Sequence, residues 1–280
     1  MKTKHTLLFL MMGASMLGAC VSEDQDLAPN LSQTGVAKKG RLTVNLNSNA
    51  RFDVTTRALN EANYRNTNNY TVQIFKSGSD APLMTCLGSE LTTNLPKELE
   101  IGSYVVTASY GTESKASRSD FRVEGSKTFT IEADKDASVN VDCAPTCGKV
   151  SVAFDSEMAT YYDNYSVTFG GTQALGTETF GWAKADTDPW YVQLGTSAET
   201  INYTISLTAK SEYAITDAAG NKQTTGTVTG TFQLERNKAQ KLIVKPNYVA
   251  PTEGGITITI IIDDSVNERQ ETITVPVSWV

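Results

Sequence analysis

Histidine is almost absent from this 280-residue chain: its one histidine, His5, lies near the start of an N-terminal leader. The rest of the chain therefore lacks Ser–His and Cys–His nucleophile pairs, histidine general bases and histidine-containing zinc sites. Carboxylates such as Glu178, Asp186 and Asp188 are present, but nothing in the sequence fixes their separation as an acid/base pair. The sequence predicts a protein that is not an enzyme and has no metal and no cofactor.

Basic clusters are also scarce. The densest is Lys38-Lys39-Gly40-Arg41, in a chain with 24 lysine and arginine residues, 31 aspartate and glutamate residues and a net charge of -7. Removal of the positive charges of Lys2 and Lys4 with the leader would take this value to -9. Nucleic acids and anionic lipid headgroups select basic patches, so neither is an expected partner.

No apolar run in the leader is long enough to span a bilayer. The stretch 7–17 follows Lys2 and Lys4, which is typical of a secretory signal peptide. Leu17-Gly-Ala-Cys20 then resembles the bacterial lipobox, in which the cysteine is acylated before cleavage. We predict a signal peptide at 1–19 and a lipid on Cys20, which would anchor the chain to a membrane. The alternative is an ordinary signal peptide with a chance cysteine.

Residues 20–39 form a polar stretch without periodicity. Glu23, Asp24 and Asp26 follow Cys20 directly, and Pro29 and Gly35 come next. The composition predicts a flexible acidic tether. The acidic residues resemble the surface-export signal of lipoproteins in the Bacteroidota, which implies an outer-membrane lipoprotein exposed at the cell surface; a merely solvated linker is the other interpretation.

Long runs of helix-forming residues are absent, and Thr, Val, Ser, Asn and Tyr are frequent, which favours strands. One order of strand-like segments occurs twice, with openings at Gly40 and Gly148, 108 residues apart. The first copy comprises 40–44, 69–75, 103–109, 128–131 and 139–141; the second comprises 148–152, 164–169, 202–209, 231–234 and 242–244. The alignment pairs Tyr70 with Tyr165 and Tyr104 with Tyr203. We predict an all-β chain with tandem β-sandwich domains at 40–147 and 148–250.

Residues 251–280 extend beyond the duplication. Two further strand-like runs, 256–262 and 272–279, predict a C-terminal β-strand tail. An unpaired apolar strand is an aggregation hazard, so we expect the tail to pair with a sheet edge. That edge belongs either to the second sandwich of the same molecule or to a neighbouring molecule.

Aromatic residues gather in the second copy at Trp182, Trp190 and Tyr191. Exposed, they could stack on the faces of sugars. Alternatively they alternate into the core, because apolar alternation continues on both sides of them.

Three cysteines lie beyond the leader and Cys20. Cys86 is expected to pack as a small core residue. Cys143 and Cys147 could form a local disulfide outside the cytoplasm, although a five-residue span at a domain junction strains the geometry of such a bond. Both the disulfide and free thiols remain open.

One group of motifs resembles a known family. It consists of Leu95-Pro, followed by Ile101-Gly-Ser-Tyr-Val-Val-Thr-Ala108, with Val54-Thr-Thr-Arg-Ala58 before it and Val141-Asp-Cys-Ala-Pro145 after it. These motifs look like an uncharacterised family of Bacteroidota surface lipoproteins similar to the fimbrillins, which are pilus subunits. Leu-Pro before Gly-x-Tyr-x-Val-x-Ala also occurs in transthyretin-like sandwiches. The resemblance implies two tandem transthyretin-like or Ig-like sandwiches, proteolytic processing after Arg57 and pilus-type subunits as partners.

Two functions follow as hypotheses. The first is a non-catalytic cell-surface lipoprotein, fimbrillin-like, that acts as a structural or adhesive component. The second is a surface lipoprotein that binds host or bacterial glycans through the aromatics of the second copy. The sequence favours the first, because no motif identifies a ligand.

Overall fold

The computed structural model describes residues 38–52, 59–216, 219–248, 256–263 and 271–275. Cys20 and Arg57 lie outside these residues. The first half contains β1 (Lys39–Ser48), β2 (Thr71–Lys76), β3 (Met84–Leu87), β4 (Lys97–Glu100), β5 (Gly102–Tyr110), β6 (Ala116–Ser117), β7 (Val123–Ile131) and β8 (Asp136–Pro145). The second half contains β9 (Cys147–Phe154), β10 (Tyr162–Gly170), β11 (Phe180–Ala183), β12 (Trp190–Gln193), β13 (Glu199–Ala209), β14 (Ile215–Thr216), β15 (Lys222–Gln223), β16 (Thr225–Leu234), β17 (Ala239–Tyr248), β18 (Ile256–Asp263) and β19 (Glu271–Val275).

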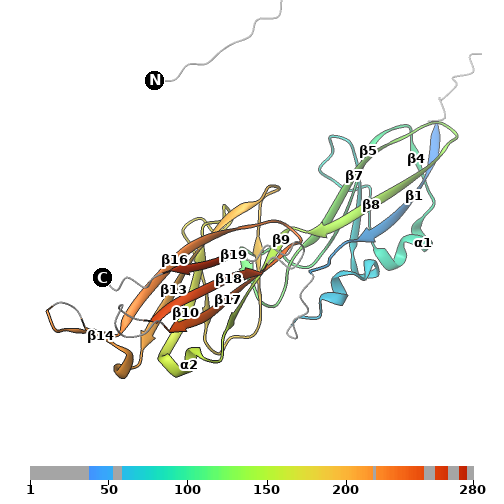
Figure 1. Cartoon of the computed structure of the whole chain (residues 1–280). Coiled ribbons are helices and arrows are strands. Elements are labelled where there is room, and N and C mark those ends of the chain that lie inside the picture. The colour runs from blue at the N-terminus through green and yellow to red at the C-terminus, as the bar shows by residue number, and fades with distance from the viewer. Residues whose placement is uncertain (1–37, 53–58, 217–218, 249–255, 264–270, 276–280) are drawn as a thin grey trace, which may run out of the picture. The chain divides into compact units, whose positions relative to one another are not determined.

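Helices are short. They are η1 (Glu61–Tyr64), η2 (Thr67–Asn69), η3 (Gly88–Glu90), α1 (Leu91–Asn94), α2 (Met158–Tyr161) and η4 (Ser211–Tyr213). The predicted all-β fold is therefore confirmed (Figure 1).

The first half is a two-layer sandwich formed by one continuous seven-stranded sheet with the strand order β3-β2-β5-β7-β8-β1-β4. β7 and β8 are paired only where Val123 and Glu124 face Pro145 and Ala144, and there the sheet passes from one layer to the other. Alternate residues point inward, as in Leu42 and Val44 of β1 against Val106 of β5, and they bury one apolar cluster.

The second half repeats this arrangement with two separate sheets, β11-β10-β13-β16 and β19-β18-β17-β9-β12-β6. Between them lies a second apolar cluster that includes Trp182, Phe169 and Leu242. In both halves the opening strand is parallel to the closing one, β1 with β8 and β9 with β17. In both halves a short strand also pairs antiparallel with the opening strand, β4 with β1 and β12 with β9. The expected duplication is visible in these pairings.

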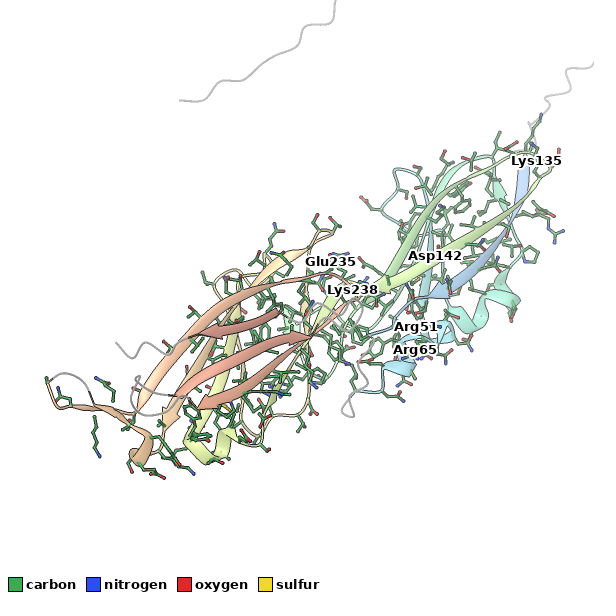
Figure 2. All side chains as sticks on the ribbon, in the orientation of Figure 1. Arg51, Arg65, Lys135, Asp142, Glu235 and Lys238 are labelled. Carbon is green, nitrogen blue, oxygen red and sulfur yellow. The ribbon has the colours of Figure 1, made fainter. Side chains whose placement is uncertain are left out.

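The turns before β8 and β17 show the duplication residue by residue. Asp134 and Asn237 each have a φ of 58°, a left-handed conformation that these two residue types tolerate. Each also donates its main-chain N–H to the first residue of the opening strand, Lys39 or Cys147, at 2.8 Å. Figure 2 labels Lys135, Glu235 and Lys238 beside these turns.

The strand registers decide the two expected tyrosine equivalences. Asp134 and Asn237 occupy the same position in the two turns, so Ile131 and Leu234, each three residues earlier, are equivalent. The residues that face them across the sheet, Gly102 and Glu199, are therefore equivalent as well. By this count Tyr70 matches Tyr165, as expected. Tyr104 instead matches Ile201, so its expected pairing with Tyr203 is wrong by two residues. Because side chains return to the same face every second residue, a shift of two preserves the apolar pattern and the sequence does not reveal it.

The C-terminal strands pair with the chain's own second sandwich. β18 lies antiparallel to β17, from Lys241 opposite Asp263 to Tyr248 opposite Ile256, and β19 lies antiparallel to β18. The expected pairing with a sheet edge is confirmed, and the edge belongs to the same molecule.

Deletion of residues 252–280 should destabilise the second sandwich, because it exposes the edge of β17 along its whole ladder with β18. We expect a lower melting temperature and new proteolytic sites within 148–248, measured by thermal unfolding and limited proteolysis. A truncated chain that melts and is cleaved like the intact protein would contradict this role of the tail.

Candidate functional site

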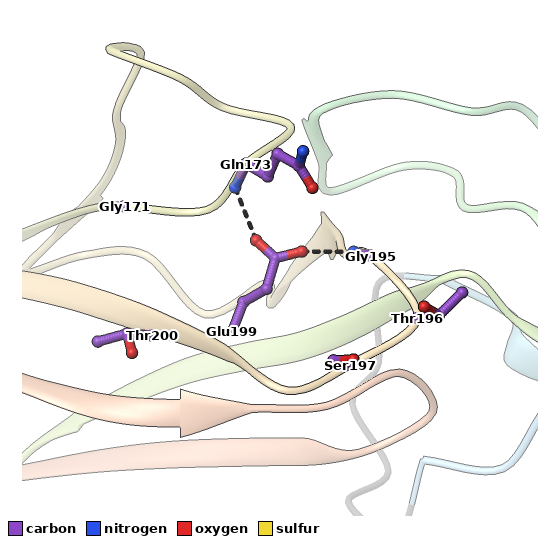
Figure 3. A pocket seen from close by; sticks show the side chains of 7 residues that line it. All are labelled: Gly171, Gln173, Gly195, Thr196, Ser197, Glu199 and Thr200. Atoms are coloured by element: carbon purple, nitrogen blue, oxygen red, sulfur yellow. Dashed lines mark hydrogen bonds between the residues drawn. The ribbon is translucent and has the colours of Figure 1, made fainter.

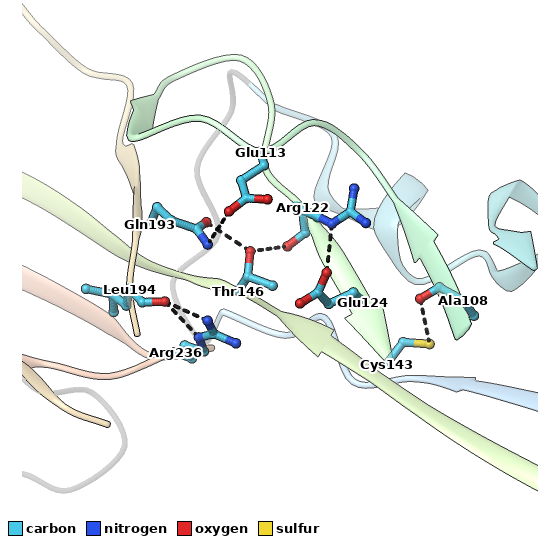
Figure 4. A network of polar contacts seen from close by, with 9 residues as sticks. All are labelled: Ala108, Glu113, Arg122, Glu124, Cys143, Thr146, Gln193, Leu194 and Arg236. Carbon is cyan, nitrogen blue, oxygen red and sulfur yellow. Dashed lines mark hydrogen bonds and ion pairs between the residues drawn. The ribbon is translucent and has the colours of Figure 1, made fainter. Parts of the chain in front are cut away.

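The two sandwiches meet at a junction where β8 continues almost directly into β9. Thr146 is the single residue between them and is only 2% exposed. Its main-chain N–H donates to the Arg122 carbonyl at 3.0 Å, and its carbonyl accepts from the Leu194 N–H at 3.2 Å. Its hydroxyl lies 3.0 Å from Oε1 of Gln193 (Figure 4). The connection is therefore bonded to both halves of the chain.

A buried ion pair lies beside this connection. Nζ of Lys149, in β9, lies 2.7 Å from Oε1 of Glu61, in η1, and the side chains are 1% and 8% exposed. The hydroxyl of Tyr191, in β12, donates to the same Oε1 at 2.6 Å. The ring of Tyr191 stacks on Phe121 with centroids 4.7 Å apart, and the Lys149 ammonium lies 5.7 Å from the Phe52 ring centroid. Burial of a charge is costly unless it is paired and hydrogen-bonded, so these groups hold the two halves in one arrangement.

A loop of the first half completes a sheet of the second. β6 lies between β5 and β7 in the chain, yet it pairs with β12. The next residue, Arg118, places its guanidinium carbon 5.1 Å from the Trp182 ring centroid and 4.6 Å from that of Trp190. Nη2 of Arg118 also donates to Oδ2 of Asp186 at 2.7 Å. The loop therefore docks through strand pairing, cation–π contact and an ion pair.

The environment of Asp186 agrees with this pairing. Burial by itself raises the pKa of a carboxyl group. Here the Ala183 N–H and the Arg118 guanidinium outweigh that effect and hold the pKa of Asp186 below its usual value. Asp186 is thus a structural partner of Arg118.

The three aromatic residues considered as a possible sugar platform are not exposed together on one surface. Trp182 is 2% exposed and belongs to the core of the second sandwich, whereas Tyr191 is 1% exposed and belongs to the apolar cluster of the first. Trp190 is half-buried, and Arg118 covers its ring. Trp182 and Tyr191 thus point into the apolar cores, as the alternative interpretation of the sequence has it.

Of the two alternatives left open for Cys143 and Cys147, the structure has the free thiols and not the disulfide. Both residues are buried free thiols, as is Cys86, which packs in the core as expected. Cys143 lies in β8 and Cys147 begins β9. Residues four apart in extended chain have Cα atoms about 13 Å apart, whereas a disulfide needs about 4.4–6.8 Å.

A cavity of about 480 Å³ lies beside Glu199 in the second sandwich (Figure 3). The Glu199 carboxylate accepts hydrogen bonds from the main-chain N–H groups of Gln173, at 2.6 Å, and Gly195. The remaining lining is glycine, serine and threonine, and the carboxylate orders two loops through these main-chain hydrogen bonds. Within the described part of the chain, no group of three or more His, Cys, Asp or Glu side chains could hold a metal ion.

Sequence reasoning missed Glu61, Lys149 and Arg118. Glu61 and Lys149 are 88 residues apart, and Arg118 and Asp186 are 68 apart. No local pattern connects such pairs.

No helix among the described residues is long and apolar enough to cross a membrane.

The model of one protein family, described as domain of unknown function DUF4493, matches residues 38–277, and the chain belongs to this family. This match confirms the expected membership in an uncharacterised domain family. No curated protein matches the sequence.

Several solved structures are similar. An adhesin candidate from Bacteroides ovatus has 9% identity and a TM-score of 0.46, over 84% of this chain and 95% of that one. A fimbrial assembly protein from Parabacteroides distasonis has 11% identity and a TM-score of 0.42, over 84% and 98%. The fimbrial anchor protein Mfa2 from Porphyromonas gingivalis has 10% identity and a TM-score of 0.36, over 84% and 100%.

The ion pair yields a stability prediction. Glu61→Gln should lower the free energy of unfolding by about 3 kcal/mol, because it leaves the buried Lys149 ammonium without this carboxylate. The double variant Glu61→Leu with Lys149→Met should lose less than Glu61→Gln. Urea denaturation measures both. Glu132→Gln, in an exposed pair with Lys135, is the control and should change little. Equal effects of Glu61→Gln and Glu132→Gln would contradict the prediction.

The thiols yield a second prediction. Burial raises the pKa of Cys143 to about 12 and raises the pKa values of Cys147 and Cys86 as well. In a chain that begins at residue 21, none of the three should react with a thiol reagent at pH 8 while the protein is folded. All three should react in guanidinium without reductant. Reaction of one thiol alone after unfolding would indicate the disulfide instead.

Proposed function

We propose that this protein is a non-catalytic, lipid-anchored cell-surface protein whose paired sandwiches act as a structural or adhesive arm. The observation that carries the proposal is the junction. The Glu61–Lys149 pair and the docking of β6 on β12 join the sandwiches into one compact unit, which suits a protein that bears load.

The leader supports the anchoring part of the proposal. Cys20 follows a short apolar stretch and the small residues Gly18 and Ala19, as a lipidated cysteine would. Two or more acyl chains suffice for stable attachment, because each buried methylene contributes about 0.8 kcal/mol. The residues between Cys20 and β1 would then hold the sandwiches away from the outer membrane.

The C-terminal tail bears on the pilus-type partners that the resemblance to fimbrillins implies. β18 pairs with β17 of its own chain, which supports a self-contained arm over a donor of strands to its neighbours. Processing after Arg57 stays a proposal. Ladders that resist sodium dodecyl sulfate would indicate polymerisation, whereas a monomer in this detergent is what a self-contained arm predicts.

The role can be tested on cells. A strain without the protein should lose surface attachment or cell–cell aggregation relative to the parent strain. The wild-type gene should restore it, and a gene with Cys20→Ser should not, because the arm is no longer anchored. Full restoration by the unanchored variant would contradict an anchored structural role.

Anchoring itself gives a separate prediction. Cys20→Ser should release the protein from the membrane fraction or leave the precursor uncleaved, as measured by fractionation and immunoblotting. The wild-type protein on intact cells should be degraded by added protease. A Cys20→Ser protein that is cleaved and still sediments with membranes would exclude the lipobox.

A further inference from the structure

A groove of about 530 Å³ follows one edge of β9 in the second sandwich. Its lining includes residues 151–156 of β9 and the turn after it, with Tyr165 of β10 and Lys184 and Thr187 of the loop before β12 around them. The groove is distinct from the cavity at Glu199, and of its lining only Asp186 takes part in the docking of the β6 loop, through Arg118.

The edge of β9 is open where the groove lies. β12 pairs with β9 only from Cys147 to Val150, whereas β17 accompanies the other side of β9 as far as Phe154. Lys149 donates its N–H to the carbonyl of Lys238, the residue before β17, at 2.8 Å, and Asp155 donates its N–H to the carbonyl of Val244 in β17, at 2.9 Å. Because main-chain groups alternate in direction along a strand, Val152 and Phe154 direct their N–H and C=O groups away from β17. Among the described residues no strand pairs with them there.

The internal repeat indicates why this edge is open. The connection from β1 to β2 has 22 residues, 49–70, whereas that from β9 to β10 has seven, 155–161. The longer connection packs beside the end of β1: the Ser48 hydroxyl donates to the Tyr64 carbonyl at 2.7 Å, and Nε of Arg65 to the Ala50 carbonyl at 3.2 Å. In the first half, the connection after the opening strand is thus long and lies beside the end of β1, whereas in the second half it is only seven residues long.

The side chains around the groove add an aromatic wall and a positive charge. The rings of Phe154 and Tyr165 meet edge to face with centroids 4.7 Å apart. Lys184 and Lys241 line the groove together with the carboxylates of Asp155 and Asp186. Arg118 already pairs with Asp186, and the Lys184 ammonium donates to the Asp163 carbonyl at 2.8 Å, so Lys184 and Lys241 are the cationic groups at the groove.

We propose that this groove binds an extended polypeptide segment of a partner protein, which adds as a strand to the edge of β9. The main-chain groups of Val152 and Phe154 would bond to the segment, an apolar side chain would contact Tyr165, and an acidic side chain would face Lys184 and Lys241. The segment comes from another protein, because β18 and β19 of this chain are already paired in their own sheet. This site deepens the proposed adhesive function and rests on it for its biological role.

The test is a selection of phage-displayed random 12-residue peptides on the full mature chain, followed by calorimetric titration of the selected synthetic peptides. We expect peptides that alternate apolar residues and carry an acidic one. Their affinity should fall at least tenfold in Tyr165→Ala and Lys184→Glu, and in Val152→Pro, which removes the outward N–H. Lys222→Glu, on the β14–β15 hairpin, is the matched control and should bind like wild type. Circular dichroism checks that each variant is folded. If the proline variant is not folded, the affinities of Tyr165→Ala and Lys184→Glu alone test the proposal.

Four results would overturn the proposal. The first is a selection that enriches no peptide, and the second is a set of selected peptides that bind all variants equally. The third is that the wild-type chain binds a polysaccharide in place of peptides and that the groove variants abolish this binding. The fourth is that the wild-type chain associates with itself and that the same variants abolish this association. The last would make a second copy the occupant. None of these results affects membrane attachment through Cys20, so failure of the groove and failure of the anchoring proposal are distinguishable.

Discussion

A positive charge is buried where the two sandwiches meet, and the junction depends on its pairing. Lys149 belongs to β9, its carboxylate partner Glu61 to the connection between β1 and β2, and the Tyr191 hydroxyl that bonds the same carboxylate to β12. Separation of the halves would leave both charges without this partner, and such a loss costs far more than the loss of a surface ion pair. The aromatic stack of Phe121 on Tyr191 covers the pair with apolar surface from both halves.

Sheet edges are the second constraint on this molecule. An uncovered edge presents unpaired N–H and C=O groups. The chain covers two edges of its six-stranded sheet with its own segments, β6 beyond β12 and the β18–β19 hairpin beyond β17. The short β12 leaves the end of β9 uncovered, and there the groove lies. The same physical requirement thus explains the docking loop, the C-terminal tail and the proposed binding site.

The repeated strand order was predictable because each copy carries its own alternation of apolar and polar residues, from Leu42 onward and from Val150 onward. The turns were readable too, since Asp134 and Asn237 are residue types that accept a left-handed conformation. Register was harder: a shift of two residues, as between Tyr104 and Tyr203, leaves the apolar pattern unchanged.

The candidate site was much less predictable. Its contacts join residues tens of positions apart, such as Arg118 with Asp186, and nothing local marks either member. Aromatic residues such as Trp182 and Tyr191 suit both a protein core and a sugar-binding surface. The sequence therefore fits both interpretations, and only the burial of the two side chains in the structure decides between them. The open edge of β9 follows from the length of β12, which composition does not encode.

Differential scanning calorimetry of the mature chain tests the central claim, that the junction joins the two sandwiches into one structural unit. The account predicts a single transition whose calorimetric enthalpy equals its van't Hoff enthalpy, because neither sandwich can leave the junction without exposing the buried pair. Two separated transitions, each with the enthalpy of half the chain, would contradict it.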